Sequence, residues 1–300
     1  MVRLGVNVPN FGPGTGPDVL RRWALTVEGL GFDLLMMSDH VAVTPDVAEQ
    51  YPAPFYEPFT TLSWLAGLTG RVGLGTTVLI VPYRHPLLIA RMAANLNDLS
   101  GGRLVLGVGV GWARQEFGAL GVPFGERGRL TDEYLLAIRA AWRDGADYRG
   151  GPVPLWIGGN SDAALRRAVR LGDAWHPMRF TPGWIAEAAG RLEAGRLIAG
   201  RLEAGGVEAG GGPALAPRIA LRLTDAPLTD GARLAGHGTI DQIAADLDQL
   251  RALGAQTVVL DPFNGDHLET ARPETAWRAL AAVAERWKQQ ESTPIDTERS

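Results

Sequence analysis

The 300-residue chain contains no cysteine. This absence excludes disulfide bonds, thiolate metal ligands and a cysteine nucleophile, and it agrees with a cytoplasmic location. Long apolar runs are also missing. No stretch approaches the ~18 apolar residues of a membrane-spanning helix, and residues 1–14 hold no apolar segment of signal-peptide length. We therefore expect a cytoplasmic protein with no membrane partner.

The chain also lacks an excess of charge of one sign. It has 29 Lys and Arg residues against 33 Asp and Glu, a formal net charge of −4, and no basic stripe that would indicate a nucleic-acid partner. The GxSxG, HExxH and P-loop motifs do not occur. Only five histidines are present, and no His-x-His follows the first expected strand, so we expect no metal site.

What does occur is a recurring junction of helix, glycine and apolar run. It reads "EGLGFDLLMM", "DLSGGRLVLGVGV" and "RALGAQTVVL" at three places. Glycine directly after a helix is the usual left-handed cap, because it has no Cβ to clash in that conformation. A helix end followed at once by a buried strand, and repeated in this way, is typical of β-α units around a parallel sheet.

The pattern predicts eight strands, each followed by a helix. The expected strands are residues 3–8, 32–37, 72–78, 104–108, 155–158, 173–176, 218–223 and 257–260. The expected helices are residues 18–30, 58–68, 87–99, 130–142, 161–171, 184–199, 240–253 and 275–289. Eight such pairs predict an α/β fold, a (β/α)8 TIM barrel with insertion loops, and a doubly wound open sheet is the competing fold. We expect one domain over residues 1–290 and a polar tail over residues 291–300.

Two local signals refine this layout. Thr239 and Gln242 have the spacing of a capping box at the start of the seventh helix. Residues 109–129, "GVGWARQEFGALGVPFGERGR", form a long segment after the fourth strand. Barrel enzymes build their sites at the C-terminal ends of the strands, so we expect this segment to be a loop lying over the mouth of the barrel.

The second expected strand, "LLMM", ends on Ser38, Asp39 and His40. An ionised carboxylate accepts hydrogen bonds, and an imidazole exchanges protons near neutral pH. The position at a strand end therefore predicts a functional pair. In the simpler interpretation, both side chains only bond loop backbone and each other.

Another strand runs straight into a helix through Gly158, Gly159, Asn160 and Ser161. Free backbone amides and the helix dipole at such a start favour an anion, and glycines allow a phosphate to approach closely. The alternative is that Asn160 or Ser161 is only an N-cap on a tight turn.

Further candidates follow other strands. Asn10 follows the first strand, Trp112 the fourth, and Trp175 and His176 end the sixth. We expect these four residues to line the substrate, with His176 as the second candidate for proton transfer. Gly109 after the fourth strand suggests the close approach of a flat ligand or of neighbouring backbone.

With these residues identified, the chain resembles the luciferase-like monooxygenase superfamily and, within it, the coenzyme F420-dependent oxidoreductases. The matching stretches are "SDH", "GTTVLIVPYRHP", "LSGGRLVLGVGVGWARQEFGALGVPFGERG", "PLWIGGNSDAALRRAVRLGDAWHP" and "GTIDQIAADLDQLRALGAQTVVL", in this order. The resemblance covers residues 3 to about 287. It implies a barrel that is usually a homodimer, a small-molecule substrate, and a deazaflavin or flavin lying across the strand C-termini.

The resemblance also implies roles for individual residues. The cofactor phosphate would lie near residues 158–161, Asp39 would bond the ring or its side chain, and Gln115 would lie beside it. His40 would be the catalytic residue, facing the reacting end of the ring. A cis peptide bond between Thr77 and Val78 would bulge against the ring.

The chain departs from this pattern at one point. Some F420-dependent dehydrogenases have a glutamate acid after the fourth strand and a tryptophan shortly after the histidine, where this chain has Trp112 and Thr44. A sugar-phosphate mechanism is therefore in doubt. We expect an F420-dependent oxidoreductase acting on a small organic substrate. The alternatives are an FMN-dependent monooxygenase that uses reduced flavin and oxygen, and a non-catalytic flavin-binding barrel.

Overall fold

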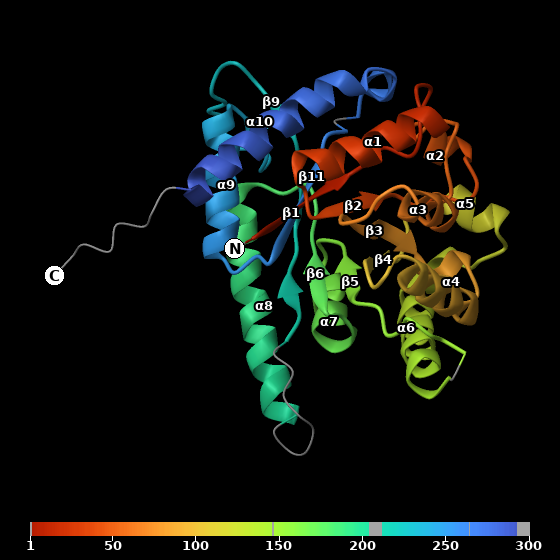
Figure 1. Ribbon diagram of the computed structural model, residues 1–300. Helices are drawn as coiled ribbons and strands as arrows, with labels where there is room; N and C mark the ends of the chain where they lie inside the picture. Colours follow the sequence, from red (N-terminus) through yellow and green to blue (C-terminus); the bar gives the residue numbers. More distant parts are fainter. Residues whose placement is uncertain (1, 146, 204–211, 264, 293–300) are drawn as a thin grey trace.

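The computed structural model describes residues 2–145, 147–203, 212–263 and 265–292 (Figure 1). A curled sheet of parallel strands forms its centre, in the order β7-β6-β5-β4-β3-β2-β1-β11-β8. The strands are β1 (Arg3–Asn7), β2 (Leu34–Met37), β3 (Gly73–Ile80), β4 (Leu104–Gly109), β5 (Leu155–Gly158), β6 (Ala174–His176), β7 (Ala214–Leu215), β8 (Arg218–Ala220) and β11 (Thr257–Asp261).

The sheet closes on itself through β7 and β8. Only Ala216 and Pro217 separate these two short strands, so together they act as one barrel strand. β7 pairs with β6, and β8 pairs with β11. The Pro217 carbonyl accepts a hydrogen bond from the Val259 N–H, which continues the ladder through the break. The predicted (β/α)8 barrel is confirmed, and the open sheet is excluded.

Helices cover the outside of the barrel (Figure 1). The long ones are α1 (Pro17–Leu30), α3 (Pro58–Ala66), α4 (Pro86–Leu99), α6 (Arg127–Asp144), α7 (Asp162–Leu171), α8 (Pro182–Glu203), α9 (Ile240–Ala252) and α10 (Pro273–Ser292). The capping box is confirmed, because Thr239 accepts from the Gln242 N–H and the Gln242 side chain accepts from the Thr239 N–H. Within the described ranges, no helix is both long enough and apolar enough to cross a membrane.

Shorter elements lie between these helices. They are α2 (Pro45–Ala48), η1 (Val81–Tyr83), α5 (Arg114–Ala119), η2 (Phe124–Glu126), η3 (His267–Ala271) and the two-residue strands β9 (Arg222–Leu223) and β10 (His237–Gly238). The segment 109–129 is therefore partly helical rather than a simple loop. α10 includes residues 291–292 of the expected tail, and residues 293–300 lie outside the described part of the chain.

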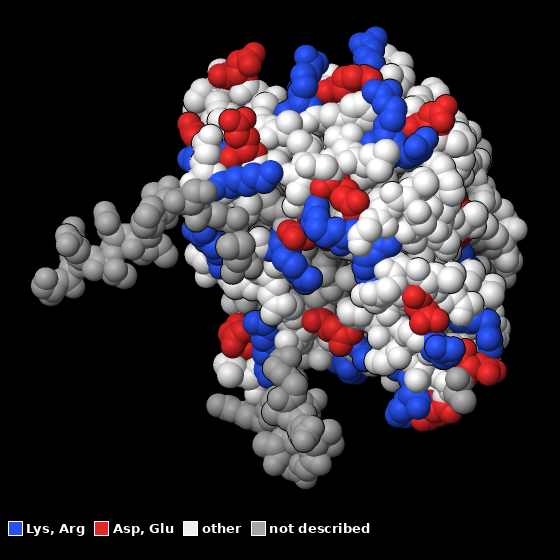
Figure 2. All heavy atoms as spheres, in the orientation of Figure 1, with Lys and Arg blue, Asp and Glu red and all other residues white. Residues whose placement is uncertain are grey.

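The faces of the strands determine which side chains reach the barrel interior. Successive residues of a strand point to opposite faces. Leu35 and Met37 of β2 are buried against the helices in one large core cluster. Met36 of β2, Trp156 of β5 and Val259 of β11 belong to a second cluster inside the barrel. On the surface, Figure 2 shows basic and acidic side chains interspersed over the visible face, without a large patch of one sign.

Candidate active site

The irregular segment directly after β2 places His40 at the mouth of the barrel. Asn10, which follows β1, holds this segment. Its side-chain N–H groups donate to the carbonyl oxygens of Ser38 at 2.9 Å and Tyr56 at 2.6 Å, and its Oδ1 accepts from the Ser38 N–H at 3.2 Å. Asn10 is fully buried and its amide is bonded on both sides. The expectation that it contacts substrate is therefore corrected, because it positions the backbone that carries His40.

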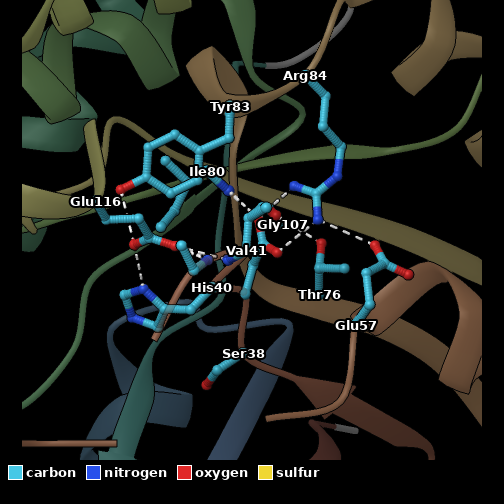
Figure 3. Close-up of polar contacts among 12 residues, drawn as sticks. Ser38, His40, Val41, Glu57, Thr76, Ile80, Tyr83, Arg84, Gly107 and Glu116 are labelled. Atoms are coloured by element: carbon cyan, nitrogen blue, oxygen red, sulfur yellow. Dashed lines mark hydrogen bonds and ion pairs between the residues drawn. The ribbon is translucent and has the colours of Figure 1, made fainter. Parts of the chain in front are cut away.

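His40 is bonded to a glutamate that comes from the segment over the mouth. Nδ1 of His40 lies 2.6 Å from Oε2 of Glu116, on α5 (Figure 3). Oε2 also accepts the Tyr83 hydroxyl at 2.9 Å. Oε1 accepts the backbone N–H groups of Val41 at 2.6 Å and Ala42 at 3.0 Å. The carboxylate thus receives four hydrogen bonds while its residue is 0% exposed.

These contacts determine the protonation states of Glu116, Tyr83 and His40. Burial by itself raises the pKa of Glu116, but the hydrogen bonds and charge of His40 and the backbone N–H groups outweigh it and lower the pKa below its usual value. Burial and the Glu116 charge raise the pKa of Tyr83, so this hydroxyl stays a donor. An ionised Glu116 can only accept, so Nδ1 of His40 carries a proton. Nε2 has no hydrogen-bond partner among the described residues.

Aromatic rings surround the imidazole. Tyr51, Phe55 and Trp112 have ring centroids 5.4, 5.3 and 5.7 Å from that of His40. Phe11 contacts Tyr51 and Phe55, and Phe263 contacts Phe11 and Tyr51. We call the five rings around His40 the aromatic cluster: Phe11, Tyr51, Phe55, Trp112 and Phe263. They follow β1, β2, β4 and β11, so the cluster spans one arc of the mouth. Trp112 belongs to this cluster, and its contact with a substrate stays a prediction.

Asp39 points to a different set of partners. Its carboxylate forms two hydrogen bonds with Arg84, at 2.7 and 2.8 Å, and accepts the Ile80 N–H at 2.9 Å (Figure 3). Arg84 also bonds Glu57 at 3.0 Å. We expected this carboxylate to accept from a cofactor. The structure instead assigns both of its oxygens to protein donors, where they join the ends of β2 and β3.

The peptide bond between Thr77 and Val78 is cis, as expected. The register between β3 and β4 shifts at this point. Val78 is partly exposed, and its side chain lies over two glycines of neighbouring strands: a Cβ at Gly109 or Gly158 would lie 2.5 or 2.6 Å from it. Gly109 and Gly158 are thus explained by the close approach of Val78. Contact of a ligand with Thr77, Val78, Gly109 or Gly158 stays a prediction.

His176 lies inside the barrel rather than at the mouth. Its Nδ1 lies 2.5 Å from the Ala216 carbonyl and its Nε2 lies 2.8 Å from the Thr77 hydroxyl. Arg218 donates to the Thr77 carbonyl at 2.8 Å and pairs with Asp261 at 2.6 Å. Burial, together with the Arg218 charge, lowers the pKa of His176 to about 4 despite the bond to Ala216. With both ring nitrogens bonded in a 0% exposed site, His176 is part of the interior network and not a substrate residue.

The expectation that Trp175 lines the substrate is also corrected, because its side chain is buried away from the mouth. It precedes His176 on β6 and so faces the helices, where it is 1% exposed and belongs to the outer core cluster. Its ring packs 6.0 Å from that of Trp184 on α8, and its Nε1–H donates to the Gly159 carbonyl at 2.9 Å. It therefore supports the turn after β5 from behind.

That turn leads into α7. Ser161 is its N-cap and accepts the Ala164 N–H at 3.2 Å. Asn160 donates to the Met178 carbonyl at 2.7 Å and accepts the Met178 N–H at 2.9 Å. The cap proposed as the simpler interpretation is thus present. The backbone N–H groups of residues 160–163 have no partner among the described residues, which leaves them available to an anion.

Gln115 is exposed at the start of α5, one residue before Glu116. Its backbone N–H donates to Asp46 of α2 at 2.9 Å, and its side-chain oxygen accepts the Asp46 N–H at 3.4 Å. The structure therefore shows it joining α2 to α5, and a contact with a cofactor stays a prediction.

Sequence reasoning did not identify Glu116 as a site residue. The doubt about a glutamate after the fourth strand rested on Trp112, yet Glu116, four residues later, bonds His40. One signal was present in the sequence: Glu116 adjoins Phe117, and Ala113 lies three residues before it. All three are 0% exposed, so the carboxylate lies on the buried side of α5. A charged residue inside an apolar pattern indicates a partner for that charge.

Comparisons with known proteins agree with this fold. A family model described as luciferase-like monooxygenase matches residues 2–209. An uncharacterized protein of Mycobacterium tuberculosis is 31% identical over 180 residues, covering 51% of this chain and 62% of that protein. An F420-dependent glucose-6-phosphate dehydrogenase of Nakamurella multipartita is 33% identical over 187 residues, covering 53% and 52%. The matched part of the chain thus spans about half to three fifths of these relatives.

Solved structures share the fold over nearly the whole chain. A monooxygenase from Streptomyces bottropensis has a TM-score of 0.71 at 20% identity, covering 97% of this chain and 100% of that one. The F420-dependent tetrahydromethanopterin reductase of Methanopyrus kandleri has a TM-score of 0.71 at 16% identity, covering 95% and 97%. At sequence identities of 20% and 16%, the similarity to these two structures shows the fold alone. The family model over residues 2–209 shows that the chain belongs to the luciferase-like monooxygenase family.

Proposed function

We propose that the protein is an F420-dependent oxidoreductase that transfers hydride between the deazaflavin and a small organic substrate. The observation that carries this proposal is the His40–Glu116 pair at the mouth, with Nε2 of His40 left for a ligand. The relatives named F420-dependent glucose-6-phosphate dehydrogenase, at 33% identity, favour the same cofactor.

The residues of the chain supply acid-base chemistry and orientation. Glu116 keeps the proton on Nδ1 of His40 and fixes the plane of the ring, and Tyr83 holds the carboxylate in place. Nε2 can then take a proton from a substrate hydroxyl or, in the imidazolium form, give one to a carbonyl oxygen. The cofactor, when bound, supplies the hydride chemistry.

The residues present fit such a cofactor. The free N–H groups of residues 160–163 suit a phosphate at the start of α7. Val78 of β3 is partly exposed and lies between β2 and β5 in the strand order. Its side chain offers an apolar surface for a flat ring. Ser161 would hold the phosphate end, and His40 would face the reacting end.

We also propose a homodimer, which light scattering of the purified protein would test.

FMN is the competing cofactor, because the family model carries the name of monooxygenases. A binding titration with F420, FMN and riboflavin side by side separates the two. We expect F420 to bind at least tenfold more tightly than FMN, a difference of about 1.4 kcal/mol. Tighter binding of FMN would favour a monooxygenase. Tight binding with no turnover of any alcohol or carbonyl compound would favour a non-catalytic barrel.

A further inference from the structure

The aromatic cluster forms the wall of the site around the proposed proton donor. Tyr51 lies tilted at 32° to the His40 ring, and Phe55 and Trp112 stand nearly perpendicular to it, at 87° and 80°. His40 itself is only 5% exposed, whereas Trp112 is 41% exposed. A molecule that reaches Nε2 must therefore pass along aromatic faces and edges, with Trp112 as the outermost ring.

The arginines that contact aromatic rings do so outside the aromatic cluster. The cation–ring contacts of the described residues involve the rings of Trp277, Tyr148, Phe124 and Trp287, and no described arginine lies over a ring of the aromatic cluster. Arg84 is held by Asp39 and Glu57, and Arg218 by Asp261.

The chain has a single lysine, Lys288, and it lies on α10 at the opposite end of the barrel, in a pocket with Val2 and Arg3 at the start of β1. Charge-assisted hydrogen bonds from arginine or lysine hold a phosphate ester most strongly, and no described arginine lies over the aromatic cluster. The buried carboxylate of Glu116, behind His40, further disfavours an anion at this place.

We infer that the substrate is a neutral, flat, apolar molecule, aromatic or conjugated, whose alcohol or carbonyl oxygen reaches Nε2 of His40. This inference rests on the proposed function for the reacting oxygen, and on the aromatic cluster for the rest of the molecule. Aromatic side chains favour offset-stacked and edge-to-face contacts with a flat ring and bring no positive charge to a phosphate group. The substrate class thus differs from the glucose 6-phosphate in the names of two relatives.

Trp112 and Trp64 provide a matched pair for the test. Both tryptophans are 41% exposed, but Trp64 lies on α3, outside the cluster. Binding of 1-acetonaphthone and of glucose 6-phosphate is measured by calorimetry, with and without F420. Wild type and Trp64→Ala should bind 1-acetonaphthone equally and should not bind glucose 6-phosphate. Trp112→Ala should bind the ketone about tenfold more weakly, and Trp112→Phe should stay within about threefold of wild type.

Two results would overturn the inference: glucose 6-phosphate binding to wild type in place of the ketone, or equal ketone affinity in Trp112→Ala and Trp64→Ala. Failure of the proposed function is a separate result. If neither F420 nor FMN binds, that proposal fails, while the ketone titration of the cofactor-free protein still decides the substrate class.

Discussion

His40 and Glu116 are 76 positions apart in the chain, and Nδ1 of the one lies 2.6 Å from Oε2 of the other. Because the carboxylate also accepts two backbone N–H groups and a hydroxyl, it cannot turn away from the imidazole without leaving donors unpaired. We therefore propose Glu116 as a positioning residue for His40, the proposed proton-transfer group.

Glu116→Gln should lower kcat on the order of 10²-fold or more, because a neutral amide no longer stabilises an imidazolium and its NH₂ group faces donors. The same variant should change the shape of the pH profile of kcat, which a purely structural defect would not do. Glu126→Gln, an exposed acid of the same segment, is the control and should match wild type. Identical pH profiles in Glu116→Gln and wild type would contradict the positioning role.

The buried His176 predicts a pH dependence of stability. Its pKa of about 4 in the folded protein lies below the ordinary value of 6.5. Between pH 6.5 and 4, His176 is protonated in the unfolded chain but not in the folded protein. The free energy of unfolding therefore has its full value above pH 6.5 and decreases as the pH drops toward 4. The total loss is about 3 kcal/mol.

Urea unfolding at several pH values measures this slope. His176→Gln should flatten it between pH 6.5 and 4, whereas His85→Asn, at an exposed N-cap, should leave it unchanged. Equal slopes in wild type and His176→Gln would show that the buried imidazole does not control acid stability.

We expect Asp39 to contribute mainly to the stability of the folded protein. Asp39→Ala leaves Arg84 buried without its main partner and the Ile80 N–H unpaired, which should cost about 3–5 kcal/mol. Removal of the exposed pair between Arg22 and Glu274 by Glu274→Ala should cost less than about 1 kcal/mol. Thermal unfolding compares the two variants. An Asp39→Ala protein as stable as wild type, with weakened cofactor binding, would return Asp39 to the role expected from the sequence.

The start of α7 is tested by a change that keeps the helix cap. Ser161→Asp retains an N-cap acceptor but adds a negative charge where a phosphate would bind, so F420 affinity should fall at least tenfold, about 1.4 kcal/mol, at unchanged thermal stability. Ser161→Asn, also a good cap, should bind normally. Gly159 is a poorer probe, since its φ of +112° would strain any side chain. Normal affinity in Ser161→Asp would make residues 158–161 a helix start only.

The sequence predicts the barrel well because its signals are local. Glycine after a helix and a short apolar run mark several of the β-α units, and eight such units favour a closed barrel over an open sheet. The break at Ala216 and Pro217 is not predicted, because each half of that strand pairs with a different neighbour.

Side-chain partners are harder to predict, because they depend on contacts far apart in the chain. Arg84 pairs with Asp39 across 45 positions, and nothing near either residue indicates it. Trp175 and His176 were both expected at the mouth, although neighbours on a strand must face opposite sides. A three-residue strand is too short to show which of the two faces inward.

The most direct test of the proposed role of His40 is His40→Ala, measured for F420 binding by titration and for turnover with the true substrate in the same preparation. Loss of a general acid or base typically lowers the rate about 10²–10⁴-fold while ground-state binding changes little. This role predicts F420 affinity within about threefold of wild type and turnover reduced by about 10²–10⁴-fold. Wild-type turnover in His40→Ala would contradict it, because the proton would then come from another group.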